Sequence, residues 1–267
     1  MRVAVIIPCH IHYKGQFEKL LNCINSLKEQ THPCSIVVGI SFASNEYYSI
    51  FKNYVFPLVK RYAKFIVRRE QTYQIMHIYN CLQKVNDHDY ILFCDDDDTY
   101  LPKRVQIFVE ISNDTNIIRE KIPFHNEESE YWCYGMKPCV LMEFYSRSND
   151  HLDLLCHKFG DIYLRNFLLY NQMFGLIVTF TAKSPLYIYD EQNENSITGT
   201  IKRKREFTQN TGLIDYMELS NQYLLALINN DIEKRDLIIK HIGDTDMSLN
   251  TIINRAKIDE FCKKLYV

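Results

Sequence analysis

The sequence predicts an α/β fold built on a doubly wound, mostly parallel sheet flanked by helices. Short apolar runs alternate with amphipathic segments through the first half of the chain, as repeated strand–helix units do. The runs are continuously apolar, which is typical of strands buried on both faces. Ligands of such sheets bind at the carboxyl ends of the strands, so the residues that follow each run are candidates for a functional site.

Four strands and the helices between them are expected in the first half. The strand-like runs are Val3–Ile7, which is closed by Pro8, Ile36–Ile40, Phe65–Val67 and Tyr90–Cys94. Apolar side chains recur every three or four residues between the runs, which predicts helices over Phe17–Leu27, Ile50–Leu58 and Ile75–Leu82. We expect three further boundary features: a cap at Asn45, a kink at Pro57 and a helix start at Pro102.

The periodicity is weaker beyond about residue 115. The segments expected to be structured there are the aromatic-rich Tyr131–Tyr145, a helix around Asp161–Tyr170, and strands at Leu176–Thr181 and Leu186–Tyr189. After the basic run Lys202–Arg205, the pattern predicts three helices, over Leu213–Ile228, Ile232–His241 and Leu249–Leu265.

The charge balance argues against nucleic acid as a partner. The 267-residue chain has 31 Lys and Arg against 33 Asp and Glu, a formal charge of -2. Domains that track phosphates usually have a pI above about 9.

Cysteine usage and hydropathy bear on the compartment. Nine scattered cysteines without a CxxC pair are typical of thiols in a reducing compartment, so we expect a cytoplasmic protein. The first apolar run is too short for a signal peptide. The uncharged stretch Asn166–Ala182 falls short of the roughly 20 apolar residues of a transmembrane segment. We expect it to be buried in the core, with weak association with a membrane surface as the alternative.

The strongest chemical signal is the run of four aspartates, Asp95–Asp98, directly after the strand Tyr90–Cys94. Adjacent carboxylates repel one another, and a divalent cation relieves that repulsion. Mg²⁺ or Mn²⁺ takes oxygen ligands, typically one or two carboxylates together with substrate phosphates. Asp95 and Asp97 could share such a metal. A solvated acidic turn is the alternative, and the position at a strand end favours the metal.

At this point the chain resembles family 2 glycosyltransferases of the GT-A fold. Val5-Ile6-Ile7-Pro8 and the run Phe93–Asp98 followed by Leu101-Pro102 resemble that family's "VIIPxYN" and "FLDxDDxxxP" motifs. The family's "IIVVDDGS" strand corresponds to Val38-Gly39-Ile40-Ser41, where the acidic pair that usually contacts the nucleobase is missing.

Two later segments extend the resemblance to about residue 200. Gly160–Arg165 resembles the family's "EDxxLxxR", and Tyr187–Thr198 resembles its "YRxHxNSIS", with Asn193 near the position of the usual metal-binding His. The resemblance implies a GT-A domain over 1–200, with a nucleotide-sugar half at about 1–115 and an acceptor half at 116–200. Residues 201–267 would form a basic linker or lid and a helical C-terminal extension.

The resemblance also implies roles for individual residues. Asp161 corresponds to the catalytic base, although a helix N-cap after Gly160 is an equal reading and Asp150 and Asp153 are weaker alternatives. The residues implied to bind the nucleotide sugar are Pro8, Cys9, His10, Ser41, Gln71, Gln74, Asp95 and Asp96. Gln71 and Gln74 also suit a polar helix start, and a metal pair of His10 and His12 is disfavoured because it lacks a third ligand.

Two further groups of residues keep alternative readings. Tyr131, Trp132 and Tyr134 could stack on an acceptor sugar or pack in the core. The run Lys202–Arg205 could close over a diphosphate, but basic runs are more often solvated.

The resulting hypothesis is a metal-dependent, inverting glycosyltransferase that uses Mn²⁺ or Mg²⁺. It would move a sugar from a nucleotide diphosphate donor, a UDP-sugar first of all, to a hydroxyl of a glycan or glycoprotein. A catalytically silent GT-A-like binding module is the first alternative, because the base-contacting acids are missing. A nucleotidyltransferase is the second, and it is disfavoured because Pro8–Gly15 holds a single glycine rather than a phosphate loop.

Overall fold

The computed structural model describes residues 1–112, 115–121, 130–148, 156, 161, 164–165, 167–168, 171, 176–190, 233 and 236–237. The chain forms two compact units, Met1–Asp190 and Glu191–Val267. Only three residues of the second unit belong to the described part. The helices expected after residue 201, and the run Lys202–Arg205, therefore lie outside the described residues.

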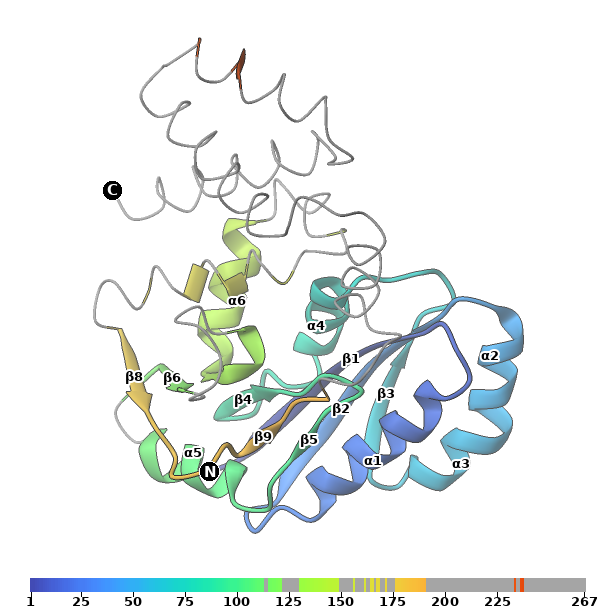
Figure 1. The fold of residues 1–267 in the computed structure, drawn as a ribbon, viewed down its shortest axis with the longest axis horizontal. Helices are drawn as coiled ribbons and strands as arrows, with labels where there is room; N and C mark the ends of the chain where they lie inside the picture. The colour runs from blue at the N-terminus through green and yellow to red at the C-terminus, as the bar shows by residue number, and fades with distance from the viewer. Residues whose placement is uncertain are drawn as a thin grey trace. The chain divides into compact units, whose positions relative to one another are not determined.

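The first unit is built on a seven-stranded sheet in the order β3-β2-β1-β4-β7-β6-β8 (Figure 1). The strands are β1 (Val3–Ile11), β2 (Cys34–Phe42), β3 (Ala63–Val67), β4 (Tyr90–Phe93), β6 (Ile117–Glu120), β7 (Tyr134–Met136) and β8 (Ile177–Phe180). β7 runs antiparallel to both of its neighbours, and the other pairs are parallel. The predicted α/β class with a mostly parallel sheet is confirmed.

Helices flank the sheet and connect its strands. They are α1 (Gln16–Lys28), α2 (Asn45–Ile50), α3 (Phe56–Val59), α4 (Gln74–Leu82), α5 (Arg104–Ile111) and α6 (Pro138–Arg147). Right-handed crossovers place α1 and α2–α3 on one face of the sheet and α4 on the other, as Figure 1 shows. A two-stranded ribbon of β5 (Thr99–Tyr100) and β9 (Tyr187–Ile188) follows the carboxyl end of β4.

β1 corrects one expectation, because it continues through Pro8 to Ile11. Alternate residues of a strand direct their backbone groups to the same neighbour, and Ile6 accepts a hydrogen bond from Cys94 on the β4 side. Pro8 therefore faces that side as well. The pairing of β4 with β1 ends at Ile6, so the missing N–H of Pro8 costs no hydrogen bond within the sheet.

The helix after β2 shows two further differences from expectation. Its cap is Ser44, whose Oγ accepts a hydrogen bond from the Tyr47 amide at 3.3 Å, and Asn45 is the first helical residue. The expected disturbance at Pro57 takes the form of a π-helical segment, Phe51–Val55, directly before α3. Pro57 then lies in the first turn of α3, where a proline is tolerated.

Candidate active site

The acidic run forms a turn at the carboxyl end of β4, beside the carboxyl ends of β1 and β2. The amide of Asp98 donates to the carbonyl of Asp95 at 3.2 Å, which closes the turn. Asp95, Asp96 and Asp97 are half-buried, and Asp98 is buried at 1% exposure. The turn is thus a partly buried cluster of four carboxyl groups rather than a fully solvated loop.

Asp95 is held by three side chains from other elements. Its Oδ1 accepts hydrogen bonds from Nε2 of Gln74 at 2.9 Å and from the hydroxyl of Tyr131, and its amide donates to the hydroxyl of Tyr187 at 3.0 Å. Burial, followed by the charges of Asp98 and Asp97, raises the pKa of Asp95 well above its usual value. Its Oδ2 accepts no hydrogen bond from the described residues.

Asp96 is held from the opposite side of the turn. Its Oδ2 accepts hydrogen bonds from Sγ of Cys9 at 2.9 Å and from Nε2 of Gln16 at 2.6 Å. Burial and the charge of Asp97 raise the pKa of Asp96 to about 7, against the lowering effect of both donors. Burial and the neighbouring Asp96 also raise the pKa of the Cys9 thiol, which keeps it a neutral donor.

Asp98 anchors the turn to the chain around β9. Its Oδ2 accepts from the hydroxyl of Tyr187 at 2.6 Å, and its Oδ1 accepts from the amide of Asp190 at 2.8 Å. Burial and the charge of Asp97 raise the pKa of Asp98 to about 7. The side chain of Asp190 forms an ion pair with Lys19 at 2.7 Å, so this lysine is directed to Asp190.

A second polar chain lies where β1 and β2 end. The hydroxyl of Ser41, which is fully buried, lies 2.8 Å from Nδ1 of His10 and 2.8 Å from Nε2 of His77. It also accepts from the amide of Thr72 at 3.3 Å. Because these groups occupy the hydroxyl, Ser41 would act on a ligand through His10, which is half-buried.

His77 is the deepest member of this chain. Burial, with the charges of His10 and Arg68, lowers its pKa to about 3, so its imidazole is neutral. Gly39 makes room for it, since a Cβ there would lie 3.0 Å from both Cβ and the carbonyl oxygen of His77. Nδ1 of His77 is buried and has no hydrogen-bond partner within the described part of the chain.

The remaining predicted residues are spread around these two clusters. Gln71 is exposed, while Gln74 opens α4 and contacts Asp95 rather than open solvent. Pro8 is buried within β1. Asp161 is half-buried, and its charge helps to raise the pKa of Tyr131, after burial and Asp95, which places Asp161 within electrostatic reach of the turn.

The aromatic side chains of residues 131, 132 and 134 are buried in the core rather than exposed to a ligand. Tyr131, Trp132 and Tyr134 are exposed by 2%, 3% and 0%, so the core alternative holds for them in this structure. The indole of Trp132 stacks on the ring of Tyr187, with centroids 4.1 Å apart. Asp150, Asp153 and Asn193 lie outside the described residues.

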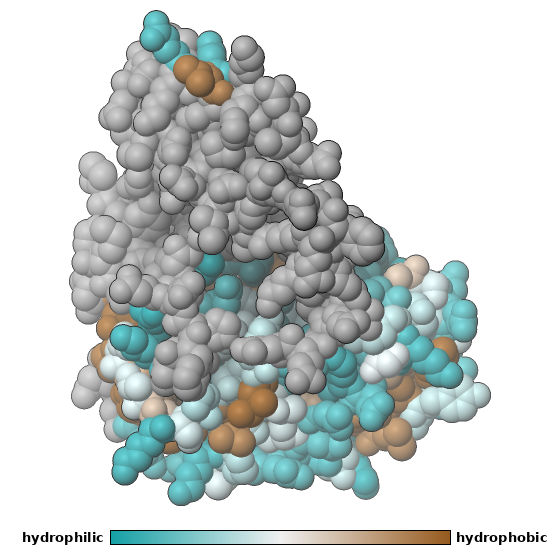
Figure 2. All heavy atoms as spheres, viewed as in Figure 1, coloured by the Kyte–Doolittle hydropathy of each residue, from teal (hydrophilic) through white to brown (hydrophobic). Residues whose placement is uncertain are grey.

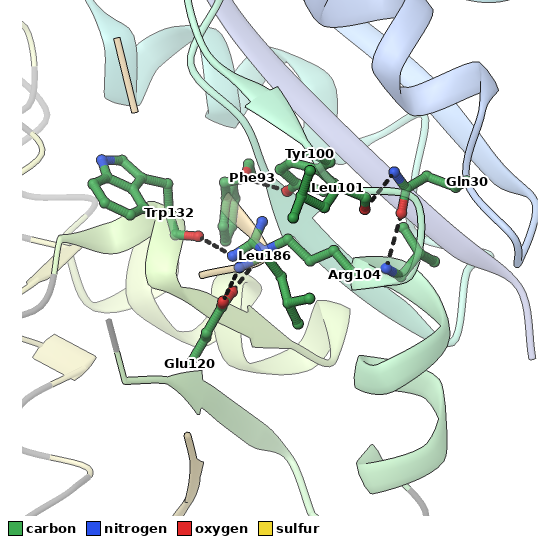
Figure 3. A network of polar contacts seen from close by, with 9 residues as sticks. Gln30, Phe93, Tyr100, Leu101, Arg104, Glu120, Trp132 and Leu186 are labelled. Carbon is green, nitrogen blue, oxygen red and sulfur yellow. Dashed lines mark hydrogen bonds and ion pairs between the residues drawn. The ribbon is translucent and has the colours of Figure 1, made fainter. Parts of the chain in front are cut away.

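A buried ion pair joins Arg104 of α5 and Glu120 of β6, close to residues that contact the acidic turn (Figure 3). Nε of Arg104 donates to Oε2 of Glu120 at 2.8 Å, and Nη2 donates to the carbonyl of Trp132 at 2.8 Å. The guanidinium lies 4.2 Å from the ring centroid of Tyr100 and 4.8 Å from that of Tyr187, the residue whose hydroxyl holds Asp98. Oε1 of Glu120 accepts from the amide of Leu186, just before β9, at 2.8 Å.

Several residues of this site are not predicted by the sequence reasoning. They are Gln16, His77, Arg104 and Glu120. Arg104 and Glu120 lie on a predicted helix and in a segment without a clear pattern, and only burial shows that they pair. A signal existed for His77, because a histidine on the apolar face of Ile75–Leu82 is a polar residue at a core position.

The donor set at the turn suits a hard cation. Among the described residues there is no group of three or more His, Cys, Asp or Glu side chains placed to hold a metal ion. Mg²⁺ and Mn²⁺ do not require one, because one or two carboxylates with water and phosphate oxygens complete their coordination. The uncommitted Oδ2 of Asp95 and the carboxylate of Asp97 supply oxygen ligands of this kind.

Comparisons with known proteins bear on the family and the fold. A family model described as "Glycosyl transferase family 2" matches residues 4–148. Crystal structures of S. aureus TarS 1-349, with and without UDP, align with a TM-score of 0.53 at 12% identity, covering 99% of this chain and 92% of theirs. No sequence among curated proteins matches this one. At this identity, the structural likeness shows the fold alone.

Proposed function

The chain belongs to glycosyl transferase family 2, and from the acidic turn we propose that it is a metal-dependent, inverting enzyme that transfers a sugar from a nucleotide diphosphate donor. The observation that carries the metal dependence is that, within the described part of the chain, Asp95, Asp96 and Asp98 accept hydrogen bonds only from neutral groups. The proposed acceptor is a hydroxyl of a glycan or glycoprotein.

Asp95 and Asp97 would hold Mn²⁺ or Mg²⁺. Such a cation neutralises the diphosphate that departs with the nucleotide. Gln74 and Tyr131 contribute by fixing Oδ1 of Asp95, so that Oδ2 is the oxygen left for the metal. Cys9 and Gln16 fix Asp96 in the same way, and Tyr187 fixes Asp98.

Asp161 is the proposed base that removes the proton from the acceptor hydroxyl. A single base opposite the leaving group leads to inversion at the sugar carbon. The influence of Asp161 on Tyr131, whose hydroxyl binds Asp95, supports a position beside the donor. Asp161→Asn should lower kcat with little change in the donor KM, which steady-state kinetics with a fixed acceptor would measure.

The nucleotide is proposed to bind along the carboxyl ends of β1 and β2. Backbone groups of Pro8 and Cys9 and the ring of His10 would line this cleft, and Gln71 is exposed beside it. Ser41 would contribute by orienting His10. UDP is the first nucleotide to test, because the similar TarS structure was solved in complex with UDP.

A panel of nucleotide sugars tests the proposal directly. Release of the nucleoside diphosphate should occur with one or a few donors, require Mn²⁺ or Mg²⁺, and stop on chelation. Calorimetric titration with UDP and Mn²⁺ distinguishes the alternative of a silent binding module. Binding without turnover would favour that module. This alternative is worth testing because the segment Val38-Gly39-Ile40-Ser41 lacks the acidic pair of the family motif.

Two features bear on where the protein works. The eight cysteines in the described part of the chain are all free thiols, which supports the proposal of a reducing compartment such as the cytoplasm. Within the described residues, none of the helices combines the length and apolar character needed to cross a membrane.

A further inference from the structure

An unusual surface lies on the helices between β2 and β3, at the edge of the sheet. Thirteen large apolar or aromatic side chains are exposed among the described residues, and five of them fall between positions 54 and 67. These five are Tyr54, Phe56, Leu58, Tyr62 and Val67. Tyr54 is 72% exposed and Leu58 60%, so both project into solvent. Isolated exposed apolar residues are ordinary, but such clustering is not.

The helix itself accounts for this exposure. Phe51, Val55 and Val59 form its buried face, and Phe51 packs against Phe65 of β3 with ring centroids 5.3 Å apart. That face packs against the core. Tyr54 and Leu58, four residues apart, therefore lie on the opposite side of the helix. Their exposure is therefore not needed for the packing of this unit.

Positive charge surrounds the same surface. Between residues 52 and 69 the chain has six basic residues and no acidic one, although its formal charge is -2 overall. All six, Lys52, Lys60, Arg61, Lys64, Arg68 and Arg69, are exposed. The guanidinium of Arg61 and the ammonium of Lys28 lie over the ring of Tyr62, at 4.7 Å and 4.0 Å from its centroid. Glu29 adds one negative charge beside Lys28.

We propose that this surface, the α2–β3 patch of Lys52, Tyr54, Leu58, Lys60, Arg61 and Tyr62, docks on an anionic lipid membrane. Aromatic and aliphatic side chains enter the headgroup region, while Lys52 in the π-helical segment and Lys60 and Arg61 in the turn after α3 attract acidic headgroups. Figure 2 shows brown, apolar surface beside hydrophilic surface over the α2–α3 region at the lower right. The sequence reasoning considered weak membrane association for Asn166–Ala182, whereas this proposal rests on a different part of the chain.

The composition of the patch distinguishes this partner from other polyanions. A nucleic acid would use the basic groups, but it would leave Leu58 and Pro57 without a favourable environment. A second copy of the chain would cover the apolar side chains, but it would bring two equally basic surfaces together. An anionic membrane offers acidic headgroups to the basic side chains and an apolar environment to the apolar ones.

The docking is independent of the proposed transfer reaction. β3 is the edge strand of the sheet, and two strands, β2 and β1, separate it from β4, which leads into the acidic turn. Substitutions in the patch should therefore leave donor hydrolysis unchanged. This makes failure of the docking proposal distinguishable from failure of the proposed function.

Vesicle flotation with the full chain tests the proposal. We expect binding to vesicles of phosphatidylcholine with phosphatidylserine, little binding to phosphatidylcholine alone, and a steep loss of binding as salt is raised. Each basic residue near the surface contributes roughly fivefold to partitioning. The double variant Lys60→Glu with Arg61→Glu should thus weaken binding by at least about tenfold.

Matched variants make the result specific. Lys84→Glu with Lys121→Glu reverses two exposed lysines elsewhere and should bind like the unchanged protein. Tyr54→Ser with Leu58→Ser should weaken binding at constant charge, whereas Met142→Ser, also at an exposed position, should not. Circular dichroism and thermal unfolding check that every variant is folded.

Three results would overturn the proposal. The first is an absence of binding to the phosphatidylserine vesicles at low salt. The second is an equal loss of binding in the patch and control variants. The third is concentration-dependent dimerisation, or binding to DNA or RNA, that depends on Tyr54 and Leu58 while vesicle binding does not.

Discussion

Two regions of this molecule bury carboxyl groups, and they do so with opposite partners. Glu120 is 1% exposed and receives a hydrogen bond from the guanidinium of Arg104, which is itself fully buried. Among the residues that the structure describes, the carboxyl groups of Asp95, Asp96 and Asp98 instead receive hydrogen bonds only from neutral amide, hydroxyl, thiol and backbone groups. The first region, the Arg104–Glu120 pair, is complete in that its buried carboxylate has a counter-charge. The second region, the acidic turn, is incomplete in that its hydrogen-bond donors carry no charge.

The difference indicates different roles for the two regions. A buried charge needs a partner of opposite sign, or its pKa shifts until the group becomes neutral. Glu120 has that partner, so the pair can serve as a fixed support for Tyr187 and the turn. Asp96 and Asp98 have pKa values raised to about 7, which is the response of carboxyl groups that lack a cation. This contrast is what supports the proposal that the turn binds a cation from outside the chain.

Breaking the complete region should have the largest effect. Glu120→Gln leaves the buried guanidinium of Arg104 without a counter-charge, which typically costs about 3–5 kcal/mol of folding free energy. Urea unfolding measures the loss. The control is Glu70→Gln, which removes an exposed ion pair with Arg68 at 3.9 Å and should leave stability unchanged. Equal effects of the two substitutions would contradict the supporting role of the buried pair.

Neutralising one group in the incomplete region should impair chemistry rather than folding. Asp97→Asn removes a proposed metal ligand, and losing several kcal/mol of charge stabilisation lowers kcat by roughly a hundredfold to a thousandfold. Stability without metal should stay the same or rise, since one repulsive charge is gone. Donor hydrolysis and Mn²⁺ titration are the measurements, with Glu18→Gln on the exposed side of α1 as the control. Unchanged metal-dependent activity would exclude Asp97 as a ligand.

The same contrast separates what the sequence predicts from what it does not. The positions of the first four strands and the place of the acidic turn follow from local signals, since continuous apolar runs ending in polar residues mark buried parallel strands. The donors to the turn include Gln16, Gln74, Tyr131 and Tyr187, which are far apart in the chain, and no local signal shows that they meet at the turn. The Arg104–Glu120 pair is not predicted either, because a charged residue in a sequence is normally expected at the surface.

Pro8 and Gly39 show that features of the backbone can also be missed in the sequence. Pro8 ends the apolar run, and the sequence therefore predicts a strand end there. The structure continues the strand, because only the neighbour on the β2 side still needs a hydrogen-bonding partner at that position. Gly39 looks like a lost acidic motif, yet its lack of a side chain is what allows α4 to bring His77 next to Ser41.

The incomplete region also predicts a pH dependence of stability. Asp96 and Asp98 have folded pKa values raised from 3.8 to about 7, so the folded state holds more protons than the unfolded state between these values. Stability without metal should therefore fall as pH rises from about 4 through about 7. Thermal unfolding across this range measures it.

Divalent cations should reverse this trend. Mn²⁺ binds the ionised carboxylates, so it should stabilise the protein more at pH 7.5 than at pH 5. Asp96→Asn should flatten the pH profile in the absence of metal. A profile that rises with pH over the same range would contradict the raised pKa values and, with them, the contrast between the two regions.

The smallest effect is expected at the edge of the incomplete region, in the chain of His10, Ser41 and His77. Ser41→Ala removes the hydroxyl that lies 2.8 Å from a nitrogen of each histidine, which costs about 1 kcal/mol of stability. If His10 contacts the nucleotide, the loss of its orientation should raise the donor KM by about threefold to tenfold at constant kcat, because binding is weakened equally in the ground and transition states. Ser44→Ala is the matched control: it removes the cap of α2 at a similar cost of about 1 kcal/mol. That variant should leave KM unchanged. An equal KM for both variants would show that Ser41 contributes only to stability, and the nucleotide would then have to be recognised by groups other than His10.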